Sequence, residues 1–321
     1  MKAGRAFLAS IAALLVLGLG DGSAARPAAG LAAQPAPVEK APILPTRVTD
    51  AEGKTVVIRD VSRIVPLNGD IAETIFTLGL TRNVVGVDTS ALYPKRTVDK
   101  LPKIGYQRTL SAEGILSLRP TVVIGSTEAG PPTVIQQLRQ AGVTVLVIPE
   151  IVTLDAGPRK LRLLSRALGV PKRGERLARQ VEGQIATAKR EAARTTTRPK
   201  VAFLYVRGAP VQMIGGRNTR ADTMIAAAGG RDAGSEIGIE GYRPITAESL
   251  VQAQPDVILV LTGGLQSVGG IEGILRIPGV AQTPAGRNRR VLDYDDALLL
   301  GLGPRTGSAL RRLVRGLHPE L

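Results

Sequence analysis

The stretch SAEGILSLRPTVVI, residues 111–124, recurs 135 residues later as TAESLVQAQPDVIL, residues 246–259, in the same register and without a gap. A Gly-Tyr pair precedes each copy, at Gly105-Tyr106 and at Gly241-Tyr242. This period is far longer than the roughly 20–50 residues of a solenoid unit. The repeat therefore predicts two similar lobes that face each other, each presenting a tyrosine loop to a cleft.

The segments around both copies indicate an α/β protein. Short runs rich in Val and Ile, among them an expected strand at 84–87, alternate with segments of helical periodicity, which is typical of a parallel sheet covered on both faces. Between the two series, residues 174–194 predict a helix about 31 Å long, with Leu177, Val181 and Ile185 on one stripe. We therefore expect two Rossmann-like lobes with parallel sheets, joined stiffly by this single long helix.

The amino-terminal residues are typical of a secretion signal. Lys2 and Arg5 precede an apolar run at 6–20, and small residues at 23–25 offer a cleavage site after Ala25. The run is shorter than the roughly 20 apolar residues of a membrane span. The expected organisation is a signal peptide at 1–25, a disordered leader at 26–45, an N-terminal lobe at 46–170, a bridging helix at 171–198 and a C-terminal lobe at 199–321.

Composition narrows the class of protein. The chain has no cysteine, so we expect no lipid anchor at the signal junction and a protein free in the periplasm. The net charge of +15 favours anionic partners, but export and an aromatic content of only 2% argue against nucleic acid. P-loop and GxSxG patterns are absent, and the single histidine, His318, argues against histidine triads and HExxH zinc sites. The sequence thus predicts a binding protein that is not an enzyme.

Tyr106 is the strongest candidate for a site residue. A phenolate oxygen suits ferric iron, and tyrosine is one of the axial ligands that haem iron accepts. A ferric ion and the guanidinium of Arg108, two residues on, would both favour the phenolate. From the residues alone, a packing or turn role for this tyrosine is the commoner outcome.

Residues 63–317 resemble the periplasmic haem-binding proteins of haem ABC importers, within the wider class of cobalamin and siderophore binding proteins. The resemblance rests on Gly105–Pro120, on Gly86–Ser90 with Tyr93-Pro94, and on Gly303-Pro304-Arg305. It implies that Tyr106 is the axial ligand of the iron of haem b, the transported ligand, and that Arg108 supports it. Some relatives add a histidine from the second lobe. This chain has none there, so Tyr242 or no protein group takes that place.

Five further residues are candidates, three for contacts with the ligand in the cleft and two for contacts with a partner protein. Tyr242 and Arg243 are expected to face the cleft and contact porphyrin or a propionate, although a turn role before Pro244 fits equally well. Arg207 is a weaker propionate candidate. Glu113 and Glu248 hold the same place in both copies, in a first helical turn, where Ser111 or Thr246 caps and the helix dipole favours a carboxylate. In the wider class, the matching glutamates dock with arginines of the membrane permease.

The sequence therefore predicts a monomeric periplasmic binding protein that delivers haem to an inner-membrane ABC permease. A ferric siderophore or a cobalamin is the rival ligand, although such ligands would be held by aromatic walls that this chain lacks. An α/β enzyme acting on an anionic metabolite and a basic polyanion-binding module are the alternatives from other classes.

Overall fold

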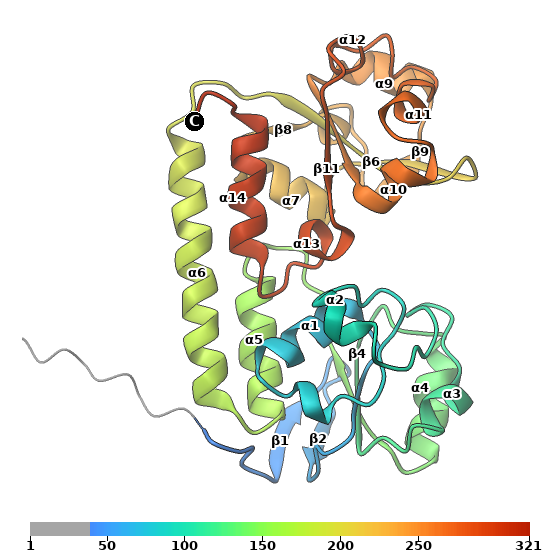
Figure 1. Ribbon diagram of the computed structural model, residues 1–321, viewed down its shortest axis with the longest axis vertical. Coiled ribbons are helices and arrows are strands. Elements are labelled where there is room, and N and C mark those ends of the chain that lie inside the picture. Colours follow the sequence, from blue (N-terminus) through green and yellow to red (C-terminus); the bar gives the residue numbers. More distant parts are fainter. Residues whose placement is uncertain (1–38) are drawn as a thin grey trace, which may run out of the picture. The chain divides into compact units, whose positions relative to one another are not determined.

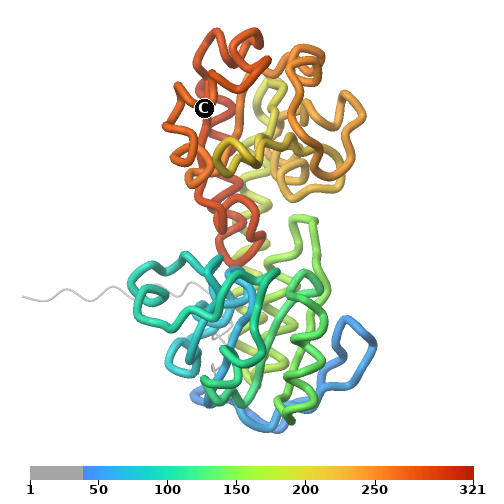
Figure 2. The backbone as a smooth tube through the Cα atoms, turned by 90° about the vertical axis from the view of Figure 1, so that its right-hand side faces the viewer, coloured from blue at the N-terminus to red at the C-terminus, as the bar shows by residue number. Residues whose placement is uncertain are grey.

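The structure, a computed structural model, describes residues 39–321, which fall within one compact unit, Pro37–Leu321. The predicted signal peptide and residues 26–38 of the predicted leader lie outside the described residues. Within residues 39–321, no helix combines the length and apolar character that a bilayer crossing needs. In two views at right angles, the blue-to-green and the yellow-to-orange parts of the chain form separate lobes (Figures 1 and 2).

The N-terminal lobe is built on a three-stranded parallel sheet. Its strand order is β3 (Ile64–Pro66), β4 (Val122–Ser126) and β5 (Thr144–Ile148), with β4 buried throughout. A hairpin of β1 (Thr46–Thr49) and β2 (Thr55–Ile58) stands beside it. The helical elements of this lobe are α1 (Gly69–Thr77), η1 (Thr81–Asn83), α2 (Lys95–Val98), α3 (Ala112–Leu116) and α4 (Pro132–Gln140).

The expected strand at 84–87 does not form. Val84 makes a single bridge to Ile64, and Val87 makes one to Lys103. The segment changes partner within four residues, so no continuous ladder develops and the prediction of a strand is wrong there.

The C-terminal lobe contains a six-stranded sheet. Its strand order is β11 (Val291–Tyr294), β10 (Val257–Leu261), β6 (Lys200–Arg207), β7 (Val211–Gly215) and β9 (Tyr242–Pro244), and β8 (Arg231–Asp232) also pairs with β6. Strands β8 and β10 pair in parallel with β6, and β11 pairs in parallel with β10. Strand β7 runs antiparallel to both β6 and β9. The predicted parallel arrangement is thus found for β6, β8, β10 and β11, whereas Gly208, at φ +67°, turns the chain back after β6 so that β7 runs antiparallel.

Seven short helices complete the C-terminal lobe. They are α7 (Arg220–Ala227), α8 (Ala233–Glu236), α9 (Ala247–Ala253), α10 (Thr262–Ser267), α11 (Ile271–Leu275), α12 (Pro284–Arg287) and α13 (Asp296–Leu300).

A long helix, α6 (Pro171–Ala193), runs past both lobes. It packs against α5 (Ala156–Ala167) at one end and α14 (Thr306–Leu317) at the other (Figure 1). The predicted apolar stripe is buried at Ala178, Val181, Ile185 and Ala188. One apolar cluster includes side chains of both sheets and of this helix, so the core continues from lobe to lobe. Such a continuous core resists bending, because packed interiors are close to crystal density.

The sequence repeat is also a structural repeat. Ser111 caps α3 and Thr246 caps α9, in both cases through the side-chain oxygen. Each helix leads into a fully buried strand, β4 or β10, that lies between two other strands. The two copies therefore build equivalent halves of two different sheets.

Residues 39–45, the end of the predicted disordered leader, make defined contacts. The Glu39 carboxylate accepts hydrogen bonds from the backbone N–H groups of Lys172 (2.5 Å) and Arg173 (3.0 Å), in the first turn of α6. The Ile43 N–H donates to the Gly169 carbonyl at 2.9 Å. For these residues the prediction of disorder is wrong, because the open N-terminus of α6 binds the carboxylate.

Two stretches that carried the resemblance meet in space on the side of the long helix. The Arg305 guanidinium binds the buried Glu73 carboxylate of α1 through two hydrogen bonds of 2.8 Å. Its Cζ atom also lies 3.8 Å from the ring centroid of Tyr93. Glu73 and Tyr93 belong to the first lobe and Arg305 to the second, so this contact joins the lobes.

Candidate functional site

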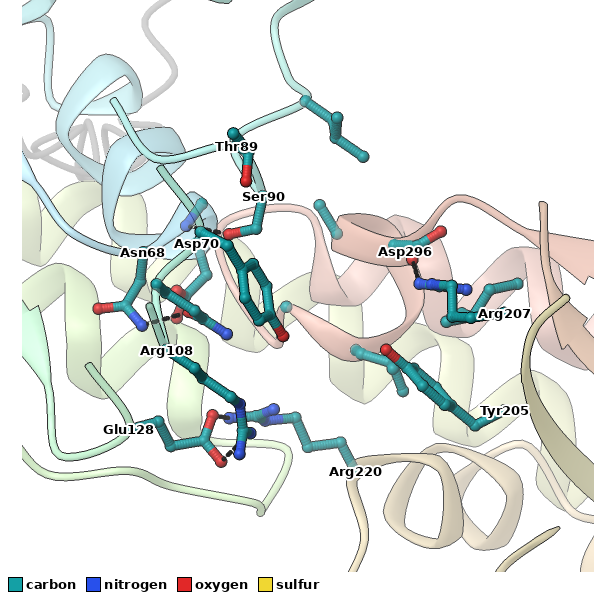
Figure 3. Close-up of a pocket in the computed structure, with 18 of the residues that line it drawn as sticks. Asn68, Asp70, Thr89, Ser90, Arg108, Glu128, Tyr205, Arg207, Arg220 and Asp296 are labelled. Carbon is teal, nitrogen blue, oxygen red and sulfur yellow. Dashed lines mark hydrogen bonds and ion pairs between the residues drawn. The ribbon is translucent and has the colours of Figure 1, made fainter. Parts of the chain in front are cut away.

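A cavity of about 740 Å³ lies between the lobes. One wall belongs to the N-terminal lobe, where α1 and the loops before α2, before α3, after β4 and after β5 line the cavity. Strands β6, β7 and β9 and helices α7 and α13 line the opposite wall, and Figure 3 labels ten of the lining residues. Three of the chain's five tyrosines line the cavity. Its lining includes Asn68, Asp70, Tyr106, Gln107, Arg108, Glu128, Glu150, Tyr205, Arg207, Met213, Arg220, Tyr242 and Asp296.

Tyr106 stands on a braced turn in the first wall. Gly105 adopts φ +99°, which favours glycine, and the Thr109 N–H closes the turn on the Tyr106 carbonyl at 2.8 Å. The Asn68 side chain donates to the Gln107 side-chain oxygen at 2.5 Å, and the Gly130 N–H donates to the Gln107 carbonyl at 2.8 Å. The turn is thus fixed on both sides, while the Tyr106 side chain lines the cavity and keeps 41% of its surface exposed.

Arg108 lines the same wall and is bound to an acid. Its guanidinium lies 3.3 Å from a carboxylate oxygen of Glu128, and its side chain is largely exposed. In the ligand-free structure the guanidinium of Arg108 is thus paired with Glu128.

Tyr242 lies in the opposite wall, in a different environment from Tyr106. It belongs to β9 and makes edge-on ring contacts with Tyr205 and Phe203, at centroid distances of 6.0 and 6.3 Å. Burial raises the pKa of Tyr242 to about 12. Its neutral phenol is therefore strongly favoured, and the ring presents an apolar surface rather than an anionic ligand.

Arg243 does not line the cavity. Its side chain is exposed, and it donates to the Tyr242 carbonyl at 3.3 Å. The expectation that Arg243 faces the cleft is not met, because successive strand residues point to opposite faces. The prediction placed both residues in a loop, where this alternation does not apply.

Arg207 does line the cavity, at the end of β6. Its guanidinium forms an ion pair with Asp296, and its Cζ atom lies 4.6 Å from the Tyr205 ring centroid. Burial raises the pKa of Asp296 even though Arg207 opposes the shift. Arg207 is thus placed to meet an anionic group.

Several polar residues of the cavity carry no sequence signal. Arg220 forms ion pairs with Glu150 and, at 3.5 Å, with Glu128, across sequence separations of 70 and 92 residues. Asp70 is paired with the buried Lys160, which also donates to the Gly301 carbonyl at 2.8 Å. Local pattern analysis does not detect such pairs, because only the fold brings their members together.

Glu113 and Glu248 lie outside the cavity. Both are exposed, in the first turns of α3 and α9. Those two helices lie on the side of their lobes away from α6 (Figure 1). Among residues 39–321, no group of three His, Cys, Asp or Glu side chains is placed to hold a metal ion.

Comparisons with known proteins agree with this architecture. A family model described as periplasmic binding protein matches residues 64–298. The periplasmic heme-binding protein RhuT from Roseiflexus sp. RS-1, solved in apo form, is 55% identical, with a TM-score of 0.80 over 81% of this chain and 99% of that one. The periplasmic heme-binding protein BhuT, solved with two hemes, is 41% identical, with a TM-score of 0.75 over 80% of this chain and 98% of that one.

A more distant relative is an uncharacterised ABC transporter substrate-binding lipoprotein of Bacillus subtilis, YvrC, which is 26% identical over 88% of either chain. Together these matches confirm the resemblance found in the sequence. The chain belongs to the periplasmic binding protein family.

Proposed function

We propose that this protein captures haem in the cavity between its lobes and delivers it to the permease of an ABC importer. One observation carries the proposal: a partly exposed tyrosine, Tyr106, stands on a braced turn at the wall of an interlobe cavity. The 55% identity to a periplasmic heme-binding protein supports haem as the ligand.

Tyr106 is the proposed iron ligand. A ferric ion stabilises the phenolate and thus lowers the energy of losing the phenol proton. Exposure allows that proton to leave to water, and the braced turn limits the entropy that ordering the ligand would otherwise cost. Haem is bound and released unchanged, so the protein needs no catalytic group.

The opposite wall suits the porphyrin ring. Tyr205, Tyr242 and Met213 offer apolar and aromatic surface there. Arg207 supplies a cation at the cavity wall for a propionate, and Arg108, two residues after Tyr106, supplies a charge that favours the phenolate. This mixture of apolar wall and few polar groups is typical of sites for small ligands.

A haemin titration followed by absorption tests the proposal. We expect the spectrum of a ferric-tyrosinate haem with saturable binding. Cyanocobalamin and a ferric siderophore, added in excess, should not displace the haemin. The absence of haemin binding, or displacement by either competitor, would refute haem as the ligand.

Glu113 and Glu248 are the proposed docking residues for the permease. Both are exposed and occupy equivalent positions in the two lobes, which suits a two-fold partner. In a vesicle uptake assay with the cognate permease, the double variant Glu113→Lys/Glu248→Lys should lose transport while its haemin titration stays unchanged. Glu272→Lys, an exposed glutamate in the first turn of α11, is the matched control. Retained transport in the double variant would exclude docking through this pair.

We further propose a monomer that is free in the periplasm after removal of the signal peptide. The lack of cysteine in the sequence supports the absence of a thioether-linked lipid. The intact mass of the exported protein and its sedimentation would test both points. A lipid-sized mass increment or a dimer would contradict them.

A further inference from the structure

Arg220 is a cavity residue that carries no sequence signal. It is the first residue of α7 in the C-terminal lobe, and its side chain reaches two carboxylates of the N-terminal lobe, Glu128 and Glu150. Figure 3 shows Arg108 and Arg220 converging on Glu128. Nearby, the Thr223 hydroxyl of α7 donates to the Val152 carbonyl at 2.7 Å, so these contacts form a joint between the lobes.

The guanidinium of Arg220 retains unused binding capacity. Its Nε atom is buried and has no hydrogen-bond partner. A guanidinium has five N–H donors in a fork that matches a carboxylate. Burial alone would lower the pKa of Arg220, but Glu150 and Glu128 raise it above its ordinary value. The residue therefore stays charged, with a donor that the protein itself does not satisfy.

The charges of the cavity wall are nearly balanced without a ligand. Arg108, Arg207 and Arg220 face four carboxylates, Asp70, Glu128, Glu150 and Asp296. A ligand with two carboxylates adds negative charge to a site of reduced dielectric, where unpaired like charges repel strongly. Binding is therefore favoured if the ligand carboxylate replaces a protein carboxylate as the partner of an arginine, and the displaced carboxylate becomes exposed to solvent.

Glu128 and Glu150 are the acids that are free to move. Their side chains are 30% and 20% exposed, and both already lie at the edge of the lobe joint. Arg207 differs, because its partner Asp296 comes from the same lobe. The pairs of Arg220 therefore connect a ligand contact to the contact between the lobes.

We propose that Arg220 binds a carboxylate of the ligand by exchange, so that Glu128 and Glu150 hold the guanidinium in the empty cavity and a ligand carboxylate replaces one of them. This inference rests on the proposed function, and it adds a specificity-determining residue and a link between ligand charge and lobe contact. Arg220 thereby selects porphyrins with free carboxylates.

Haemin and its dimethyl ester, which lacks free carboxylates, are the probes. The wild-type protein should bind haemin more tightly than the ester. In Arg220→Gln, haemin affinity should fall about 10–100-fold, as expected for a lost charge-assisted hydrogen-bonded pair, while ester affinity changes little. Glu150→Gln removes a competing acid and should raise haemin affinity several-fold without affecting the ester.

Controls separate this inference from the proposed function. Arg231→Gln breaks an exposed pair with Glu236 outside the cavity lining and should leave both affinities unchanged. Arg220→Lys keeps the charge but loses the fork, and it replaces Arg220→Gln if that variant fails to fold. Equal losses for haemin and the ester, or no loss for either, would overturn the exchange. Wild-type protein that binds no haemin at all would instead refute the proposed function.

Discussion

Tyr106 and Tyr242 each follow a glycine just before one copy of the same repeat, yet they end in different environments. Tyr106 projects from a turn and keeps 41% of its surface exposed. Tyr242 lies in β9, paired through the backbone with Gly215 and packed on two aromatic rings. The same sequence signal therefore gives one partly exposed phenol on a turn and one phenol packed in a sheet.

The neighbours of each tyrosine explain the difference. Around Tyr106 the chain is a turn, in which Asn68 and Gly130 hold Gln107. The residues just before the turn make only an isolated bridge and loop hydrogen bonds with residues 87–89. Before Tyr242 the hairpin of β6 and β7 has extended the sheet, and β9 adds to its edge. A phenol that packs in a sheet is desolvated, and desolvation disfavours the phenolate that iron requires.

The largest effect is expected on haemin ligation, and it tests whether Tyr106, rather than Tyr242, binds the iron. Tyr106→Phe should abolish the ferric-tyrosinate absorption and lower haemin affinity by at least about 100-fold, because loss of the ligand exceeds the 10–100-fold typical of its supporting contacts. Tyr242→Phe keeps the ring and should retain the spectrum, with an affinity change below about threefold. Absorption titrations of both variants provide the measurement. The opposite pattern would make Tyr242 the ligand.

The next largest effect is on stability, where replacing Tyr242 should matter more than replacing Tyr106. Tyr242→Leu loses two edge-on ring contacts, each worth about 0.5–1.5 kcal/mol, so the free energy of unfolding should fall by about 1–3 kcal/mol. Tyr106→Leu alters an exposed side chain and should stay within about 0.5 kcal/mol of wild type. Urea unfolding of the ligand-free proteins measures both values. A larger loss for Tyr106→Leu would show that the turn tyrosine is a packing residue.

The smallest effect is a pH dependence specific to Tyr242. Its pKa is about 12 in the folded protein, above the usual value near 10, so the folded state holds the proton more tightly. The contribution of this pKa shift to the free energy of unfolding is fully present below about pH 10 and is lost as the pH rises toward 12. By pH 11 the loss should be about 1 kcal/mol. Tyr242→Phe should lack this component of the slope. Equal slopes in wild type and variant would show that the hydroxyl is not desolvated.

Much of the fold was predictable from local pattern. The repeat located α3, β4, α9 and β10, and the apolar stripe around Val181 located α6, although that helix begins earlier, at Pro171. The antiparallel turn at Gly208 and the broken strand at 84–87 were missed. In both places the outcome depends on which distant segment supplies the hydrogen-bond partner, and a single window of sequence does not contain that segment.

The candidate site divides in the same way. Tyr106, Arg108, Tyr242 and Arg207 were predicted and line the cavity, whereas Arg243 was predicted and does not. Arg220, Glu128 and Glu150 were not predicted, although they form the ion pairs that cross between the lobes. Their roles arise from proximity across 70 or more residues, which no local spacing records.

By itself, the sequence determined the class of fold, the long connecting helix and the tyrosine on its turn. These features depend on interactions within a few residues: capping residues, apolar periodicity and glycine at a left-handed position. A short window of sequence is therefore enough to predict them. Only the tertiary structure decided which tyrosine is desolvated and which arginine meets an acid of the other lobe. Burial and charge pairing are properties of surroundings, and those surroundings exist only after distant segments have packed together.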